Sequence, residues 1–141
     1  MCSLESIILY KLHFLNKEIN SKFSGCTGIS PSRLELLQLL YQGDELSQQD
    51  LQKELNIDNA AITRHLQQLE ANEMITRRKK ETDNRVTLVR LTNQGRQKIS
   101  TFEEEKNRFV NTMLENVQVE ERKLLLDLLN RMQNNIQHIQ I

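Results

Sequence analysis

Residues 60–71 carry side chains that could contact a nucleic acid. At 100° per residue, Ile62, Leu66 and Leu69 predict the buried stripe of a helix. The opposite face then holds Ala60, Thr63, Arg64, Gln67 and Ala71. Small residues at the leading end allow close approach, and Thr, Arg and Gln can reach base edges and phosphates. This pattern predicts a helix that enters the major groove of DNA.

A second candidate group of cations follows Met74, where the periodicity changes from helical to strand-like. ITRRKK and RVTLVRL, separated by ETDN, predict a two-stranded hairpin with a polar tip. Its cations are Arg77, Arg78, Lys79, Lys80 and Arg85. A hairpin directly after a recognition helix is a wing, whose tip can reach a narrow, A·T-rich minor groove that attracts arginine. Because strand side chains alternate, only some of these cations can face DNA.

Capping signals predict the helices that position these groups. Ser47, followed three residues later by Asp50, predicts the start of one helix, which ends near Asn56. Asp58 predicts the N-cap of the next helix. A connection of about three residues between two short helices is typical of a helix-turn-helix.

Apolar periodicity predicts further helices around this segment. We expect helices over 4–23, from Pro31 with Gly43 as terminator, from Thr92 to about Asn116 and over Val119–Ile141, and a loop over Ser24–Ile29. The run from Leu124 to Leu129 is apolar around most of the last helix. One small domain cannot cover such a helix, so we expect the terminal helices to interdigitate with those of a second copy.

The charge distribution is compatible with a nucleic-acid partner although the 141-residue chain has no net charge. Residues 62–98 carry nine Lys/Arg against four Asp/Glu, so the positive charge is concentrated on the predicted recognition helix and wing. We find no Walker loop, GxSxG elbow, HExxH or CxxC pattern, so the sequence predicts no enzyme, cofactor or metal site. The N-terminal apolar run is too short for a secretion signal or a membrane span, which predicts a cytoplasmic protein.

Three groups of residues resemble the MarR (multiple antibiotic resistance regulator) family. Asp83-Asn84-Arg85 followed by Leu91-Thr92-Asn93-Gln94-Gly95 is similar to the family's wing signature. Thr63-Arg64 with Leu69-Glu70 resembles its recognition helix, and Leu46 to Leu51 the preceding helix. The likeness covers nearly the whole chain, and the motifs are specific in combination.

The resemblance implies a mainly α winged helix-turn-helix fold of about six helices plus a β-hairpin wing. Residues 1–29 and 99–141 would be dimerisation helices, and residues 30–98 the DNA-binding lobe. A homodimer would place two recognition helices on a pseudo-palindromic operator in double-stranded DNA. The family pattern implies repression, with release by a small phenolic or lipophilic effector.

The predicted DNA-binding residues come from both helices and the wing. They are Ser47, Asn59, Ala60, Thr63, Arg64, Gln67, Arg77, Lys79, Asp83 and Arg85. Arg85 is the expected minor-groove residue, and Asp83 is expected to hold its guanidinium through a charge-assisted hydrogen bond.

Three alternatives remain open. A redox sensor could use Cys2 or Cys26. Peroxide-sensing members of the family that this chain resembles use a reactive cysteine within the first helix, but residues 4–23 have none. A winged helix can also bind another protein. A small enzyme is the third, although no nucleophile, base and orienting group occur together.

Overall fold

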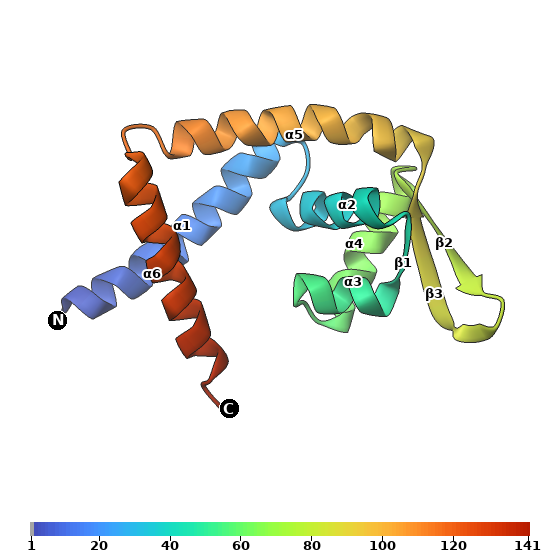
Figure 1. Ribbon diagram of the computed structural model, residues 1–141, viewed down its shortest axis with the longest axis horizontal. Coiled ribbons are helices and arrows are strands. Elements are labelled where there is room, and N and C mark those ends of the chain that lie inside the picture. Colours follow the sequence, from blue (N-terminus) through green and yellow to red (C-terminus); the bar gives the residue numbers. More distant parts are fainter. Residues whose placement is uncertain (1) are drawn as a thin grey trace. The chain divides into compact units, whose positions relative to one another are not determined.

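The computed structural model describes residues 2–141, and over this range the chain forms six helices and three strands (Figure 1). The elements are α1 (Leu4–Thr27), α2 (Pro31–Gly43), β1 (Glu45–Ser47), α3 (Gln48–Leu55), α4 (Asn59–Ala71), β2 (Ile75–Lys80), β3 (Asp83–Leu91), α5 (Asn93–Met113) and α6 (Val119–Gln137). They fall into two compact units, Met1–Phe109 and Val110–Ile141. The predicted division by function, into dimerisation helices (1–29 and 99–141) and a DNA-binding lobe (30–98), is not tested by these units and stays a prediction.

The helix-turn-helix forms where the capping signals predicted it. Ser47 Oγ accepts a hydrogen bond from the backbone N–H of Asp50 at 3.0 Å, which caps α3. Asp58 Oδ1 accepts one from the N–H of Ala61 at 2.7 Å, which caps α4. Between them, Asn56 adopts the left-handed conformation (φ 52°) that ends α3. Each cap satisfies backbone donors that a helix start otherwise leaves unpaired.

An aliphatic core holds these helices in place. The predicted stripe of α4 is confirmed, because Ile62 and Leu66 are completely buried and Leu69 nearly so. They join fully buried leucines of α2 and α3 and the strand residue Val89 in one cluster. Phe23 and Phe109 add an edge-to-face ring contact at 5.3 Å between centroids. The outward face of α4 is therefore fixed by what its inward face buries.

The wing is part of a three-stranded antiparallel sheet in the order β1-β3-β2, so the predicted two-stranded hairpin was incomplete. Strand β1 pairs with residues 88–90 of β3. A three-residue strand is too short to show a period of two, and its partner lies far along the chain, so no local pattern marks it. Beyond the helices, β2 and β3 continue as a projecting hairpin with a bulge between Lys79 and Lys80 (Figure 1).

Thr92 and Gly95 join the end of β3 to the turn that precedes β2. The Thr92 hydroxyl donates to the carbonyl of Glu73 at 2.7 Å, and its N–H donates to the carbonyl of Met74 at 3.0 Å. The same hydroxyl oxygen accepts the Gly95 N–H at 3.0 Å. A Cβ at position 95 would collide with the Met74 carbonyl oxygen. The Leu-Thr-x-x-Gly motif thus closes the base of the wing.

Two glycines act differently from the prediction. Helix α1 continues through the predicted loop at Ser24 and Gly25 and ends only at Gly28, which has φ 80°. The Thr27 hydroxyl oxygen lies 2.8 Å from the carbonyl oxygens of both Phe23 and Ile29, and its one hydrogen can be donated to either of them. Gly43 is the last residue of α2 rather than its terminator, and Asp44 takes the positive φ instead.

Gly43 is small for a packing reason rather than a conformational one. A Cβ there would lie 3.2 Å from Leu46 Cδ2, closer than ordinary van der Waals contact. The glycine therefore permits close approach of the chain entering β1.

The unit Val110–Ile141 contains the end of α5 and all of α6. Arg122 donates to the carbonyls of Leu114 at 2.9 Å and Val117 at 2.8 Å, which ties the start of α6 to the preceding turn. Helix α5 ends at Met113 and α6 at Gln137, each a few residues short of the prediction. No residue of α6 is buried, and Leu126 is 61% exposed. None of the helices in residues 2–141 has the length and apolarity that crossing a membrane requires.

Candidate nucleic-acid interface

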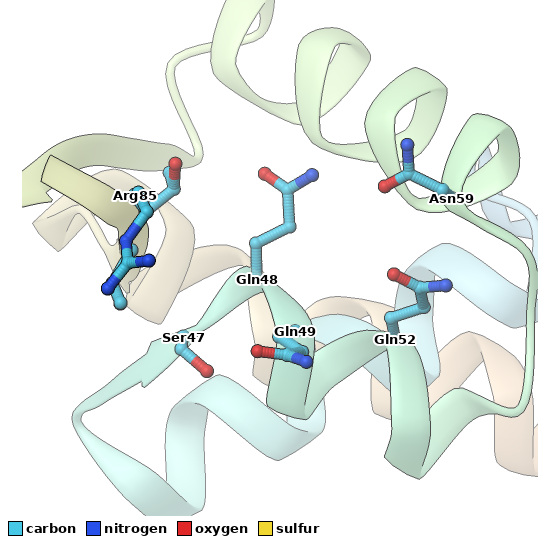
Figure 2. Close-up of a pocket in the computed structure, with 8 residues that line it drawn as sticks. Ser47, Gln48, Gln49, Gln52, Asn59 and Arg85 are labelled. Carbon is cyan, nitrogen blue, oxygen red and sulfur yellow. The ribbon is translucent and has the colours of Figure 1, made fainter.

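A polar groove of about 320 Å³ lies where α3, α4 and the wing meet. Its lining residues are Ser47, Gln48, Gln49, Gln52, Asn59, Arg85, Val86 and Thr87. Figure 2 shows the Gln48 side chain between Arg85 on one side and Asn59 on the other. Three of the predicted residues, Ser47, Asn59 and Arg85, are therefore brought together from three different elements.

The outward face of α4 presents the predicted hydrogen-bonding side chains. Ala60, Arg64 and Gln67 are exposed, and Thr63 is half-buried. The Thr63 hydroxyl donates to the carbonyl of Asn59 at 2.8 Å and accepts from Gln48 Nε2 at 3.5 Å. Because its hydrogen is already committed, Thr63 can offer a ligand only its remaining lone pair and its methyl group.

Arg85 is an exposed cation near the wing tip, with its side chain 91% exposed. Asp83 Oδ1 accepts from both the backbone N–H of Arg85 at 3.0 Å and its Nε at 3.1 Å. The expected contact between these two side chains is present. Hydrogen bonding to Arg85 lowers the pKa of Asp83, so the carboxylate stays ionised and can orient the guanidinium.

Arg77 has an internal partner. Its guanidinium donates to Glu70 Oε1 at 2.8 Å, which links β2 to α4. This hydrogen bond lowers the pKa of Glu70, so the pair is charged at neutral pH. Arg77 therefore fixes the wing relative to the recognition helix, and its predicted contact with DNA stays a prediction.

Lys79 and Thr87 form a cross-strand pair on the same face of the wing as Arg77. Lys79 Nζ donates to Thr87 Oγ1 at 3.0 Å, and the two residues are register partners in β2 and β3. Lys79 is exposed and Thr87 lines the groove, so this cation lies on the wing next to the groove wall.

His65 lies on the half-buried side of α4. Arg33 Nε of α2 donates to His65 Nδ1 at 3.1 Å. Burial, then the positive charges of Arg33 and Arg64, lower the pKa of His65. The neutral ring is therefore favoured, because only an unprotonated Nδ1 can accept the arginine hydrogen.

Five groove residues were not among the predicted set, and they are Gln48, Gln49, Gln52, Val86 and Thr87. Gln48 and Gln52 are spaced at i and i+4, which places them on one side of α3, and this spacing is a signal that could have identified two of them. Val86 and Thr87 line the groove only because of the hairpin register, which the sequence does not specify.

Other candidate sites are sparse in the described part of the chain. No three His, Cys, Asp or Glu side chains of residues 2–141 come together in a way that could hold a metal ion. Cys2 and Cys26 are exposed free thiols, and a redox role for either stays a prediction.

Fold and groove together define a winged helix-turn-helix protein with an exposed recognition helix. A family model described as the MarR family matches residues 29–87. The HTH-type transcriptional regulator YdgJ of Bacillus subtilis (strain 168), itself uncharacterized, is 60% identical over 139 residues, which is 99% of this chain and 85% of that protein.

Solved structures have the same fold at low identity. The PcaV regulator of Streptomyces coelicolor, in complex with its natural ligand, matches with a TM-score of 0.86 at 16% identity, over 95% of this chain and 96% of that one. A mutant MarR from E. coli complexed with operator DNA matches with a TM-score of 0.80 at 22% identity, over 93% of this chain and 99% of that one.

The chain belongs to the MarR family. It is a DNA-binding, winged helix-turn-helix transcriptional regulator, and the family is one of regulators and not of enzymes.

Proposed function

We propose that this protein binds a pseudo-palindromic operator as a homodimer, with α4 in the major groove and the wing tip in the adjacent minor groove. The observation that carries the proposal is the groove in which Arg85 of the wing, Asn59 of α4 and Ser47 before α3 share one surface. One DNA strand can contact all three because their elements converge there. Arg64 and Gln67 then reach base edges, while Ala60 allows close approach.

The wing supplies the second part of the proposed interface. Arg85, oriented by Asp83, enters the minor groove, and Lys79 contacts a phosphate beside it. Arg77 acts mainly through Glu70, by holding the wing at a fixed position relative to α4. Positioning and contact are thus divided among the cations of the hairpin.

Unpartnered apolar faces support the homodimer. In α1, Leu4 is 69% exposed and its apolar neighbours Ile7, Ile8 and Leu9 are also exposed. In α6, every leucine from 124 to 129 is exposed. Apolar area of this extent on a monomer marks an association surface. A symmetric dimer would cover both helices and display two copies of α4.

Repression with release by a small molecule is the proposed mode of regulation. PcaV is described in complex with its natural ligand, and a MepR-like protein with pseudoligands, so proteins with this fold bind small molecules. We propose a phenolic or lipophilic effector for this chain as well. The effector would favour a spacing of the two recognition helices that does not match the operator half-sites.

Selection of bound sequences from a random duplex pool tests the DNA proposal. We expect enrichment of a pseudo-palindrome whose half-sites lie about 10 base pairs apart, one helical turn. An affinity for that duplex that falls steeply with salt would argue against the alternative of a protein-binding winged helix. Failure of any sequence to enrich would contradict operator binding.

A further inference from the structure

Glu45 and Arg78 form a bidentate ion pair across the wing sheet. Arg78 Nε donates to Glu45 Oε2 at 3.0 Å, and its NH2 group donates to Oε1 at 2.8 Å. Glu45 is the register partner of Arg90, and Arg78 that of Leu88, both in the central strand β3. The pair therefore joins the two edge strands over the top of β3.

This pair differs from the one made by Arg77. The Arg77 side chain is 24% exposed and pairs with Glu70 of α4, whereas that of Arg78, on the other face of β2, is 53% exposed. A phosphate can therefore reach Arg78, but it meets a guanidinium whose charge is balanced by Glu45. Hydrogen bonding to Arg78 lowers the pKa of Glu45, and the same contact raises that of Arg78, so both groups are charged at neutral pH.

A guanidinium held by two carboxylate oxygens at 3.0 Å and 2.8 Å, a closer pairing than that of Arg85 with Asp83 at 3.1 Å and 3.4 Å, contributes little net charge to counterion release. Affinity for DNA of any sequence comes mainly from phosphate neutralisation by Lys and Arg. Base contacts from α4 are unaffected by such a pair. The number of available wing cations therefore sets a contribution to affinity that is the same for the operator and for any other duplex.

We infer that Glu45 limits the general affinity of this protein for DNA, because it withholds Arg78 from DNA phosphates. The inference rests on the DNA-binding function of this lobe and adds a role for a residue outside the groove. Lys79, Lys80 and Arg85 are then the wing cations available to DNA. Arg78 would be a fourth if its pairing with Glu45 were removed. Releasing Arg78 raises the affinity for the operator and for other duplexes by about the same factor.

The test compares three variants on a fluorescently labelled duplex of mixed sequence, with affinity measured across a salt series. Glu45→Gln keeps the side-chain shape and releases Arg78. Glu45→Gln/Arg78→Gln removes both charges and restores the net charge of the original protein. Glu54→Gln, on α3, removes one negative charge without releasing Arg78 and is the control for net charge.

We expect the salt slope of Glu45→Gln to steepen by about 0.9, the value for one additional phosphate contact. Between about 50 and 200 mM salt, this protein would lose roughly threefold to fourfold more affinity than the original. The double variant should return to the original slope, and Glu54→Gln should not share the increase. Thermal unfolding by circular dichroism checks that each variant is folded.

Two results would overturn the inference. One is an unchanged slope for Glu45→Gln, or an equal change in Glu54→Gln. The other is a slope that stays steep when Arg78 is also removed. Either leaves the proposed function intact, whereas failure of the original protein to bind any duplex would refute DNA binding itself.

Discussion

At the scale of single residues, the candidate interface contains cations that are exposed to a ligand and cations that are paired within the protein. Arg85 is exposed and oriented, whereas Arg77 and Arg78 each have a carboxylate partner in another element. The run of four cations in β2 looks uniform in the sequence. Partners at Glu70 and Glu45 decide what each arginine does, and no local pattern predicts those pairs.

Arg64 is an exposed cation on the outward face of α4, and we expect it to contact a base or a phosphate. Substitution by alanine should weaken operator binding by about 1–3 kcal/mol, roughly 5- to 150-fold, because a base or phosphate contact is lost. Gel-shift titration with the selected operator measures this. Lys22→Ala, on α1, removes a cation far along the chain and serves as the control. Equal affinities for Arg64→Ala and the original protein would contradict the proposed role.

His65 makes stability depend on pH. Its pKa is lower in the folded protein than in the unfolded chain, so the unfolded chain binds more protons as pH falls below about 6.5. The free energy of unfolding should therefore decrease between about pH 7.5 and pH 5.5, and the decrease should be smaller in His65→Gln. Urea unfolding at several pH values measures both. Parallel pH profiles for the two proteins would show that His65 is not responsible.

At the scale of elements, the sequence predicted what local chemistry specifies. Ser47 and Asp58 identified two helix starts to the residue, because a cap is a short-range hydrogen bond between neighbours. Strand β1 was missed, since it exists only through pairing with β3. The roles of Gly25 and Gly43 were also misjudged, because the conformation of a glycine depends on packing that the sequence does not show.

For the candidate site, the sequence found the side chains but not their arrangement. The face of α4 followed from helical periodicity, and the contact between Asp83 and Arg85 is local. The groove depends on three elements meeting, so Val86 and Thr87 had no comparable signal.

The junction at Gly95 predicts a large difference between two glycine-to-alanine substitutions. Gly95→Ala should destabilise the protein by about 1–3 kcal/mol, because the new methyl group collides with the Met74 carbonyl. Gly25→Ala is the matched control. It lies in α1 with no heavy atom within 4 Å of the added Cβ, so it should stabilise by about 0.5–1 kcal/mol. Chemical denaturation measures both, and similar effects would contradict the role of Gly95.

At the scale of the whole molecule, the apolar face of α6 predicts that dimerisation and operator binding fail together. Leu125→Asp/Leu128→Asp should weaken dimerisation by about 3 kcal/mol or more, hence at least roughly 100-fold, because two leucines that the proposed dimer would bury are lost. Lys123→Glu, on the opposite side of the helix at 100° per residue, is the control. Sedimentation equilibrium gives the oligomeric state. A double variant that stays dimeric and still binds the operator would refute this interface.

The sheet order has a consequence for solubility. Strand β2 is an edge strand, so one side of its backbone lacks a partner within the sheet. Unprotected edges recruit strands from other molecules and start aggregation. Here the edge bears Arg77, Arg78, Lys79 and Lys80 in succession, so two such edges would repel each other on approach. The hairpin that serves DNA is thereby protected from fibre formation while it projects into solvent.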